Sequence, residues 1–398
     1  MKNDQMVKNK TILVSVVMPC LNEEETLGTC IQKAQNTLEA LGIQGEVVVA
    51  DNGSTDASVA IAERLGARVV HQPLRGYGAA YLAGIAAAEG QYIVIGDSDD
   101  TYDFTDLERF ITPLRNGCDF VIGNRLKGEI LPGAMPKLHR YLGNPVLTGI
   151  LNVLFRSGVS DAHCGMRSFT REAYQQMELQ TTGMEFASEM VINATKADLK
   201  IEEIPITYSP RKGESKLNSF RDGWRHLRFM LMLSPTYLFL IPGILLFLMG
   251  VIGTVALLPG PLQIGNRAYD IHVMVLACLL CLLGYQVLLL GLSARTLSVT
   301  RGFSSSDSLI QFVYRHFTLE KGLLLGCVIF AVGFLIDGWI AYGWVKSGFG
   351  ELQKVRPALF ALLLMILGTQ TIFSAFFVSM LGIPTEKNTG YENSKGPS

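Results

Sequence analysis

The chain has 398 residues, of which 49% are hydrophobic and only 17% are charged, where a soluble domain carries roughly 25% charged residues. Its 34 basic residues balance 35 acidic ones, so the chain as a whole has no positive field that would attract nucleic acid. Seven scattered cysteines, an odd number, favour a reducing compartment and disfavour a disulfide framework. The low share of charge indicates a membrane protein.

The first half of the chain alternates short apolar runs with longer amphipathic stretches. The apolar runs are rich in Val and Ile and short enough for buried parallel strands, at residues 12–18, 46–50, 68–71, 92–96 and 119–123. The stretches between them are expected to be helices, at residues 23–41, 56–65, 76–88 and 103–115. Strands joined by right-handed helical crossovers build a doubly wound α/β sheet, which binds ligands at the carboxyl ends of its strands.

Polar residues gather where four of these strands end. The sets are, in chain order, Asn22 and Glu23, Asp51 to Asp56, Asp97 to Asp100, and Asn124 and Arg125. Asp97 and Asp99 place two carboxylates after a buried strand, where Mg²⁺ or Mn²⁺ could bridge them to a diphosphate. An acidic turn with no ligand is the plainer alternative for such a pair. The glycine motifs of nicotinamide folds and P-loop NTPases are missing from the sequence.

The second half, residues 235–382, is expected to form a four-helix transmembrane domain. Its apolar runs cover about residues 237–258, 273–293, 322–345 and 358–381, and roughly 20 residues suffice to cross a bilayer. Asp337 is the one charged residue within these runs, and the pattern assigns it no role. Residues 383–398 are expected to be a disordered tail.

Two segments have the pattern of amphipathic helices that lie in the membrane interface, at residues 219–234 and near 306–317. The alternative is that both are ordinary helices entering the bundle. No signal peptide precedes the first strand, and the connections on the side of the large domain hold twelve Lys and Arg against four on the other side. The positive-inside rule therefore predicts a protein of the inner cell membrane with residues 1–218 and both termini in the cytoplasm.

Several motifs resemble those of known glycosyltransferases. Residues 16–24 (VVMPCLNEE), 51–56 (DNGSTD) and 97–99 (DSD) resemble the GT-A domain of family 2 glycosyltransferases. Residues 123–125 (GNR), 161–167 (DAHCGMR) and 211–217 (RKGESKL) resemble later motifs of the polyprenyl-phosphate branch, which includes dolichol-phosphate mannose and glucose synthases. The resemblance covers residues 12 to about 233 and implies a GT-A, Rossmann-like domain at residues 1–218.

The resemblance also implies roles for single residues. It implies a nucleotide-sugar site at Pro19, Asn22, Glu23, Asp51 and Asp97, and a metal site at Asp97 and Asp99. It implies an acceptor-phosphate site at Arg125, Arg140, Arg211, Ser215 and Lys216, and catalytic roles for Asp99, Asp161 and Arg125. Plainer roles stay open: Asp161 as a turn or helix cap, the two arginines at 125 and 140 as surface ion pairs, and residues 211–216 as a headgroup-binding cluster. Asn52 and Asn144 depart from commoner residues, which leaves the substrate undetermined.

The expected function is inverting transfer of a hexose, from UDP-glucose or GDP-mannose, to undecaprenyl or dolichyl phosphate at the cytoplasmic membrane face, giving a lipid-linked sugar donor for cell-envelope glycosylation. The expected cofactor is Mg²⁺ or Mn²⁺, and the partners are the nucleotide-sugar, the polyprenyl phosphate and membrane lipids, with no nucleic acid. Homo-oligomers are left open. The alternatives are a nucleotide-sugar-binding scaffold, a lipid-sugar transporter, or a processive polysaccharide synthase, whose Q-x-x-R-W motif is missing.

Overall fold

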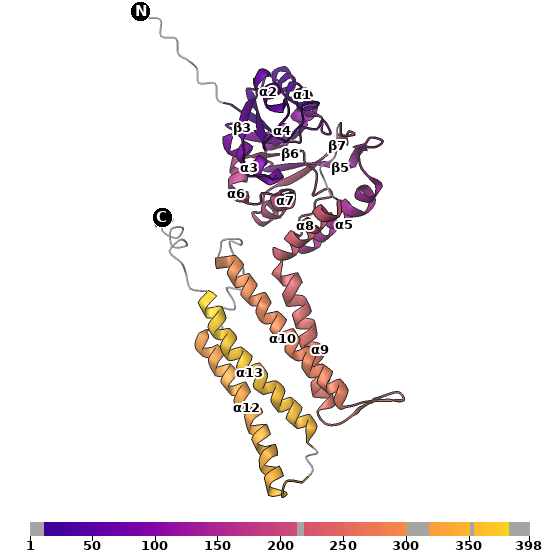
Figure 1. Cartoon of the computed structure of the whole chain (residues 1–398), viewed down its shortest axis with the longest axis vertical. Coiled ribbons are helices and arrows are strands. Elements are labelled where there is room, and N and C mark those ends of the chain that lie inside the picture. The colour runs from indigo at the N-terminus through magenta and orange to yellow at the C-terminus, as the bar shows by residue number, and fades with distance from the viewer. Residues whose placement is uncertain (1–11, 213–218, 301–317, 351–353, 382–398) are drawn as a thin grey trace, which may run out of the picture. The chain divides into compact units, whose positions relative to one another are not determined.

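The computed structural model describes residues 12–212, 219–300, 318–350 and 354–381. The chain divides into two compact units, Met1–Met230 and Leu231–Ser398 (Figure 1). The predicted second interfacial helix, the predicted tail, and the candidate residues Ser215 and Lys216 lie outside the described residues.

A mixed seven-stranded sheet forms the centre of the first unit, in the order β3-β2-β1-β4-β6-β5-β7. The strands are β1 Val14–Cys20, β2 Gly45–Asp51, β3 Arg68–His71, β4 Tyr92–Ile95, β5 Phe120–Ile130, β6 Arg167–Thr170 and β7 Ile201–Tyr208. All run parallel except β6, which is antiparallel to both β4 and β5. The α/β class and the five predicted strands are therefore present, but the sheet is not purely parallel.

Strands β6 and β7 were absent from the sequence prediction, and β5 is longer than predicted. β6 has four residues and begins with Arg167, a charge that breaks the apolar pattern of a buried strand. The Arg167 guanidinium is nevertheless 1% exposed, because it donates to the carbonyls of Ala162, Cys164 and Ala187 at 2.7–2.8 Å. These bonds replace the water that a buried cation would lose.

Helices such as α3 Tyr77–Ala87 and α4 Leu107–Arg115 pack against the sheet through apolar faces. The other helices before the membrane-length ones are α1 Leu27–Ala40, α2 Ser58–Arg64, η1 Phe104–Asp106, η2 His139–Gly143, α5 Asn144–Phe155, α6 Arg171–Met177, α7 Phe186–Lys196 and α8 Ser219–Met232. In α4 the residues Leu107, Phe110, Ile111 and Leu114 are buried at helical spacing. A Cβ at Gly84 of α3 would lie 2.5 Å from Val17 Cγ1, so only glycine permits this close packing on β1.

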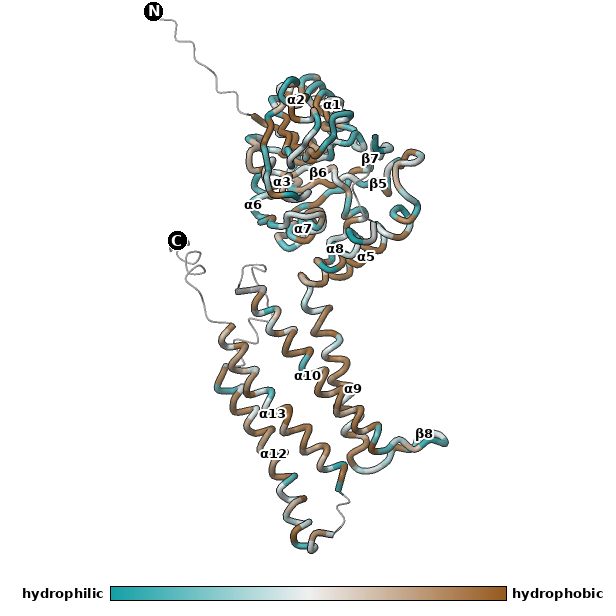
Figure 2. Tube along the Cα trace, in the orientation of Figure 1, coloured by the Kyte–Doolittle hydropathy of each residue, from teal (hydrophilic) through white to brown (hydrophobic). Residues whose placement is uncertain are grey.

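The described part of the second unit holds four helices that are long and apolar enough to cross a membrane: Thr236–Leu257, Ile271–Leu297, Leu319–Lys346 and Val355–Leu381. They consist of η3 Thr236–Leu240 with α9 Ile241–Leu257, then α10 Ile271–Thr300, α12 Leu319–Lys346 and α13 Val355–Leu381. A short hairpin, β8 Leu262–Ile264 and β9 Arg267–Tyr269, connects α9 to α10. Figure 2 shows hydrophobic residues along all four helices, as expected of an integral membrane protein.

Glycines bring α9 and α10 into close contact. A Cβ at Gly250 would lie 2.2 Å from the backbone nitrogen of Cys281, and one at Gly284 would lie 2.2 Å from that of Phe247. Small residues matter in a bilayer because lipid tails are as apolar as leucine, so helices associate through close packing.

Replacing Gly250 by isoleucine should force α9 away from α10, because the added side chain would collide with the Cys281 backbone. Overpacking of this kind costs roughly 1–3 kcal/mol, which we expect to lower the melting temperature of the protein in detergent. Gly338→Ile is the matched control, since no heavy atom lies within 4 Å of the Cβ position at Gly338 in α12. Equal melting temperatures for the two variants would contradict the close contact.

Candidate functional site

Asp97 and Asp99 follow β4 at the carboxyl edge of the sheet. Asp97 Oδ1 accepts hydrogen bonds from the hydroxyls of Tyr77 at 3.0 Å and Tyr81 at 3.1 Å. Its Oδ2 accepts no hydrogen bond from the described residues. Burial and the neighbouring charge of Asp99 raise the pKa of Asp97 to about 6, against the opposing effect of the two tyrosines. The carboxylate pair is therefore held close together with too little positive charge nearby.

This pair fits a hard divalent cation. Mg²⁺ and Mn²⁺ prefer oxygen ligands, and Mg²⁺ is commonly bound by one or two carboxylates together with substrate phosphates. Within the described ranges no three His, Cys, Asp or Glu side chains cluster tightly enough to hold a metal, so Asp97 and Asp99 would hold the ion with oxygens of the substrate. A Cβ at Gly165 would lie 2.8 Å from Asp97 Oδ2, so glycine keeps this oxygen accessible.

The guanidinium of Arg211 faces the acidic pair formed by Asp97 and Asp99. Its Nη1 lies 3.4 Å from Asp99 Oδ2, and its Nη2 donates to Glu23. The sequence placed Arg211 at the acceptor phosphate and Glu23 at the nucleotide, whereas the structure groups both with the candidate metal site. The Arg211 Nε is buried and makes no hydrogen bond to the described residues. The guanidinium therefore retains a donor for an anionic ligand.

Asp51 ends β2 in a ring of donors. Its carboxylate accepts hydrogen bonds from the backbone N–H groups of Gly53 at 3.2 Å and Ser54 at 2.9 Å, and it lies 3.2 Å from His71 Nδ1. Burial raises the pKa of Asp51, but the hydrogen bonds outweigh this effect and hold the pKa below its usual value. Asp51 is therefore ionised, and hydrogen bonds fix its position at the strand end.

Asn22 and Pro19 support neighbouring loops. Asn22, with φ +53°, accepts a hydrogen bond on Oδ1 from the backbone N–H of Thr55 at 2.7 Å. The carbonyl of Pro19 accepts one from Ser98 Oγ at 2.6 Å. These contacts connect the ends of β1, β2 and β4, so both residues hold together the loops that carry Asp51 and the acidic pair.

Arg125 and Asp161 form a buried ion pair. Arg125 is 7% exposed and Asp161 is fully buried. Arg125 Nε donates to Asp161 Oδ2 and Nη2 donates to Oδ1, both at 2.8 Å, and the Arg125 backbone N–H donates to Oδ2 at 3.1 Å. Burial acts to raise the pKa of Asp161, but Arg125 holds it below its usual value. Asp161 is therefore an ionised partner of Arg125 with both oxygens occupied.

Other side chains position this pair. Glu203 of β7 accepts hydrogen bonds from the backbone N–H groups of Ser160 at 2.6 Å and Asp161 at 3.0 Å. The Arg125 guanidinium lies 5.3 Å from the ring centroid of Tyr208, which packs against Tyr102 at 5.4 Å. The Tyr102 hydroxyl accepts from the backbone N–H of Gly165, the residue beside Asp97. This chain of contacts connects the ion pair to the carboxylate pair.

Arg125 lies within β5, whereas the sequence analysis predicted that it follows the strand. The pairing of β5 with β7 shifts register between Asn124 and Glu129, an irregularity of the kind that redirects side chains. Arg140 lies on η2, with its guanidinium 5.4 Å from the ring of Tyr141. Among the described residues it makes no hydrogen bond or ion pair with the other candidates, so the structure does not join it to the site.

A buried polar cluster that the sequence pattern did not predict lies beside Asp161. It consists of His163, Ser188 of α7 and His226 of α8, and we call it the histidine cluster. Ser188 Oγ lies 2.8 Å from His226 Nδ1 and 3.3 Å from His163 Nε2. The two imidazole rings meet edge to face at 4.6 Å between centroids.

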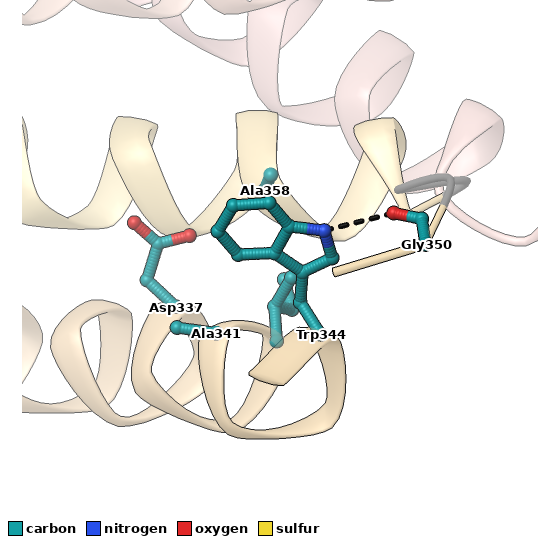
Figure 3. Close-up of a pocket in the computed structure, with 6 residues that line it drawn as sticks. Asp337, Ala341, Trp344, Gly350 and Ala358 are labelled. Atoms are coloured by element: carbon teal, nitrogen blue, oxygen red, sulfur yellow. Dashed lines mark hydrogen bonds between the residues drawn. The ribbon is translucent and has the colours of Figure 1, made fainter. Parts of the chain in front are cut away.

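The second unit has a hollow of its own, of about 480 Å³, at the α12–α13 connection. Its lining includes Asp337, Ala341 and Ala358, together with Trp344, whose indole N–H donates to the Gly350 carbonyl at 2.8 Å (Figure 3). Asp337 makes no hydrogen bond or ion pair with the described residues. Nothing in its surroundings resembles the carboxylate and arginine pairs of the first unit.

An α/β domain with a carboxylate pair after one strand and a buried arginine–aspartate ion pair, followed by four membrane-length helices, has the architecture of a membrane-bound GT-A enzyme. Residues 15–177 match glycosyl transferase family 2, and residues 292–382 match the glycosyltransferase family 2 C-terminal transmembrane region. The low-salt glycan biosynthesis hexosyltransferase Agl6 of Haloferax volcanii is 44% identical over 370 residues, 93% of this chain and 89% of that protein. The chain therefore belongs to glycosyltransferase family 2 and is a glycosyltransferase.

Two further similarities cover the first unit. A dolichyl-phosphate hexose transferase of Haloferax volcanii is 35% identical over 212 residues, 53% of this chain and 89% of that protein. A glucosyl-3-phosphoglycerate synthase from Mycobacterium tuberculosis, solved with Mn²⁺, UDP-glucose and phosphoglyceric acid, is 23% identical with a TM-score of 0.46, covering 55% of this chain and 78% of that one.

The histidine cluster predicts a pH dependence of stability. Burial lowers the pKa of His226 from 6.5 to about 4, and burial together with His226 also lowers that of His163. The charged groups facing His226 are Glu185 and Asp222, which favour its protonation, and Arg167, which opposes it. Between pH 6.5 and about 4, His226 is protonated in the unfolded chain but neutral in the folded chain. The free energy of unfolding therefore falls as the pH is lowered from 6.5 towards 4.

His226→Asn should remove this pH dependence, which changes the free energy of unfolding by up to about 1.4 kcal/mol per pH unit. The measurement is thermal unfolding of wild type and variant at pH 7, 6 and 5. The difference in melting temperature between them should shrink or reverse at the lower pH. A constant difference across the series would contradict a neutral, buried His226.

Proposed function

We propose that the protein transfers a hexose from a nucleotide-sugar to a polyprenyl phosphate, with inversion at the anomeric carbon. One observation carries this proposal: the Asp97–Asp99 pair and the Arg125–Asp161 pair lie at the same sheet edge and are joined through Tyr102 and Tyr208. Such a site offers a place for a metal-bound diphosphate next to a fixed arginine for a second anion. The hexosyltransferase and dolichyl-phosphate hexose transferase named above support both the sugar and the lipid acceptor.

On the donor side, Asp51 and the loops held by Asn22 and Pro19 would bind the nucleoside, and Asp97 and Asp99 would hold the divalent cation. A bound Mg²⁺ or Mn²⁺ supplies positive charge for the diphosphate leaving group. Arg211 lies at the same acidic pair and keeps an unused donor, so it would contact the diphosphate or the acceptor phosphate.

On the acceptor side, the lipid phosphate is ionised near neutral pH and needs positioning more than deprotonation. Arg125 uses its Nε and one Nη2 hydrogen on Asp161, which leaves three N–H groups for the phosphate. Asp161 has a low pKa and no free oxygen, so it orients Arg125 and does not act as a base. A phosphate oxygen then bonds to the anomeric carbon while the carbon–oxygen bond to the nucleoside diphosphate breaks on the opposite face.

The proposed setting is the cytoplasmic membrane face. The Lys and Arg distribution supports a cytoplasmic location for residues 1–218 and both termini. In α8 the exposed residues Trp224, Arg225 and Arg228 support a helix that lies in the interface, close to a lipid acceptor. The four spans would anchor the domain and accommodate the isoprenoid tail.

The proposal is tested with purified protein in detergent, undecaprenyl or dolichyl phosphate, Mg²⁺ or Mn²⁺, and radiolabelled UDP-glucose, UDP-galactose, UDP-N-acetylglucosamine and GDP-mannose offered separately. Counts in the organic phase that need one donor and disappear with chelator would identify the sugar. Metal-dependent nucleotide binding without transfer to lipid would instead favour the scaffold or transporter alternative.

Asp99→Asn should reduce transfer by at least 100-fold, because the amide removes half of the negative charge that would hold the cation. The protein should still fold and insert into membranes. Asp103→Asn is the control, since Asp103 caps η1 and Asn is an equally good cap. Wild-type transfer by Asp99→Asn in excess chelator would refute the metal assignment.

Arg125→Lys should raise the KM for the lipid phosphate, because lysine keeps the charge but cannot bind Asp161 and a phosphate bidentately. Loss of one charge-assisted hydrogen bond, about 1.5–3 kcal/mol, corresponds to roughly a 10- to 100-fold change. The KM for the nucleotide-sugar should change little. Arg109→Lys, in an exposed ion pair with Asp106, serves as control, and an equal rise in both KM values for Arg125→Lys would argue against an acceptor role.

A further inference from the structure

One buried polar atom next to the Arg125–Asp161 pair has no partner. His163 Nδ1 is buried and makes no hydrogen bond to the described residues, while Nε2 of the same ring faces Ser188. Leaving a buried donor or acceptor unpaired is costly, and such an atom in a native structure calls for an explanation. A ligand that pairs with it in the working enzyme is one explanation.

The position of His163 indicates which kind of ligand would pair with Nδ1. His163 follows Asp161 by two residues, and the charges of both Asp161 and Arg125 affect its protonation. The carbonyls on either side of it, those of Ala162 and Cys164, are held by the guanidinium of Arg167. The backbone around His163 is therefore fixed, close enough to the Arg125–Asp161 pair for both charges to act on its ring.

We propose that His163 Nδ1–H donates a hydrogen bond to the phosphate of the acceptor, in a tautomer set by the histidine cluster. This rests on the proposed function, because it takes the acceptor to be a phosphate. It adds His163 as a ligand-binding residue, and Ser188 and His226 as residues that position it.

The geometry of the cluster allows this tautomer without any net charge. Ser188 has one hydroxyl proton and lies between two ring nitrogens, so it donates to one ring and accepts from the other. If His226 Nδ1–H donates to Ser188 Oγ, the Ser188 hydroxyl donates to His163 Nε2, and the His163 proton is on Nδ1. The opposite arrangement leaves a lone pair on His163 Nδ1, which would repel a phosphate. An anion therefore selects the donor form.

A neutral donor suits this position. Burial, the facing ring of His226 and the cations Arg125 and Arg167 all lower the pKa of His163, so a charged imidazole is disfavoured there. The neutral ring would add a directed hydrogen bond to a phosphate that the remaining N–H groups of Arg125 also contact. Because His226 belongs to α8, displacement of that helix would also break the hydrogen bonds that set the tautomer of His163.

Two amide substitutions separate the ligand role from a structural role. In His163→Asn the amide nitrogen takes the place of Nδ1 and the contact with Ser188 is lost. In His163→Gln the amide group takes the place of Nε2 and the donor at Nδ1 is lost. We expect His163→Gln to raise the KM for polyprenyl phosphate about 10-fold or more, with the KM for the nucleotide-sugar unchanged, and His163→Asn to remain within about threefold of wild type.

The opposite order, with Asn worse than Gln, would show that the contact with Ser188 matters and would overturn the proposal. Equal values for both variants, or a matching rise in the KM for the donor, would overturn it too. Wild-type transfer to lipid in the same assay tests the proposed function by itself. If wild type binds polyprenyl phosphate without transferring to it, dissociation constants replace KM values, and if it does neither, both proposals fail.

Discussion

The site depends on the buried Arg125–Asp161 ion pair, which contacts from several parts of the domain stabilise. Removing the Arg125 and Asp161 charges from water costs several kcal/mol per ion, and mutual attraction offsets this only with good geometry and further hydrogen bonds. Both conditions are met by the two 2.8 Å bonds, by Glu203 beneath Asp161, and by the ring of Tyr208 beside Arg125. The pair is thus preorganised, and substrate binding need not rearrange it.

The acidic pair has the opposite balance. Burial and the charge of Asp99 raise the pKa of Asp97, and Arg211 lies 3.4 Å from Asp99. A site with surplus negative charge favours a cation, whereas the saturated Arg125–Asp161 pair leaves spare N–H donors for an anion. In the proposed function, the two pairs would therefore divide the sheet edge into a metal side and a phosphate side, with Tyr102 and Gly165 between them.

The sequence indicated the parts of this arrangement that rest on local pattern. β1, β2 and β4 are short apolar runs followed by polar residues, which located Asp51, Asp97 and Asp99 at strand ends. Contacts between distant segments leave no such pattern. The four-residue β6 lacks an apolar pattern because it begins with the buried Arg167. The contact between Arg211 and Glu23 joins residues that are 188 positions apart in the chain. In the membrane unit, hydropathy indicated the spans, but the glycines that fit α9 to α10 depend on helix rotation, which composition does not specify.

The tyrosines and histidines illustrate the same limit from the chemical side. Tyr77 and Tyr81 belong to an apolar helix and would be expected only to fill the core, yet their hydroxyls bind Asp97. His163 and His226 are 63 residues apart in the chain, and only the fold brings them to a common serine. In the proposed reaction no proton is removed from the acceptor, so these polar groups would serve to orient the substrates. A domain that positions two anions with fixed neutral donors and paired charges avoids the reorganisation that mobile, solvated side chains would require at each turnover.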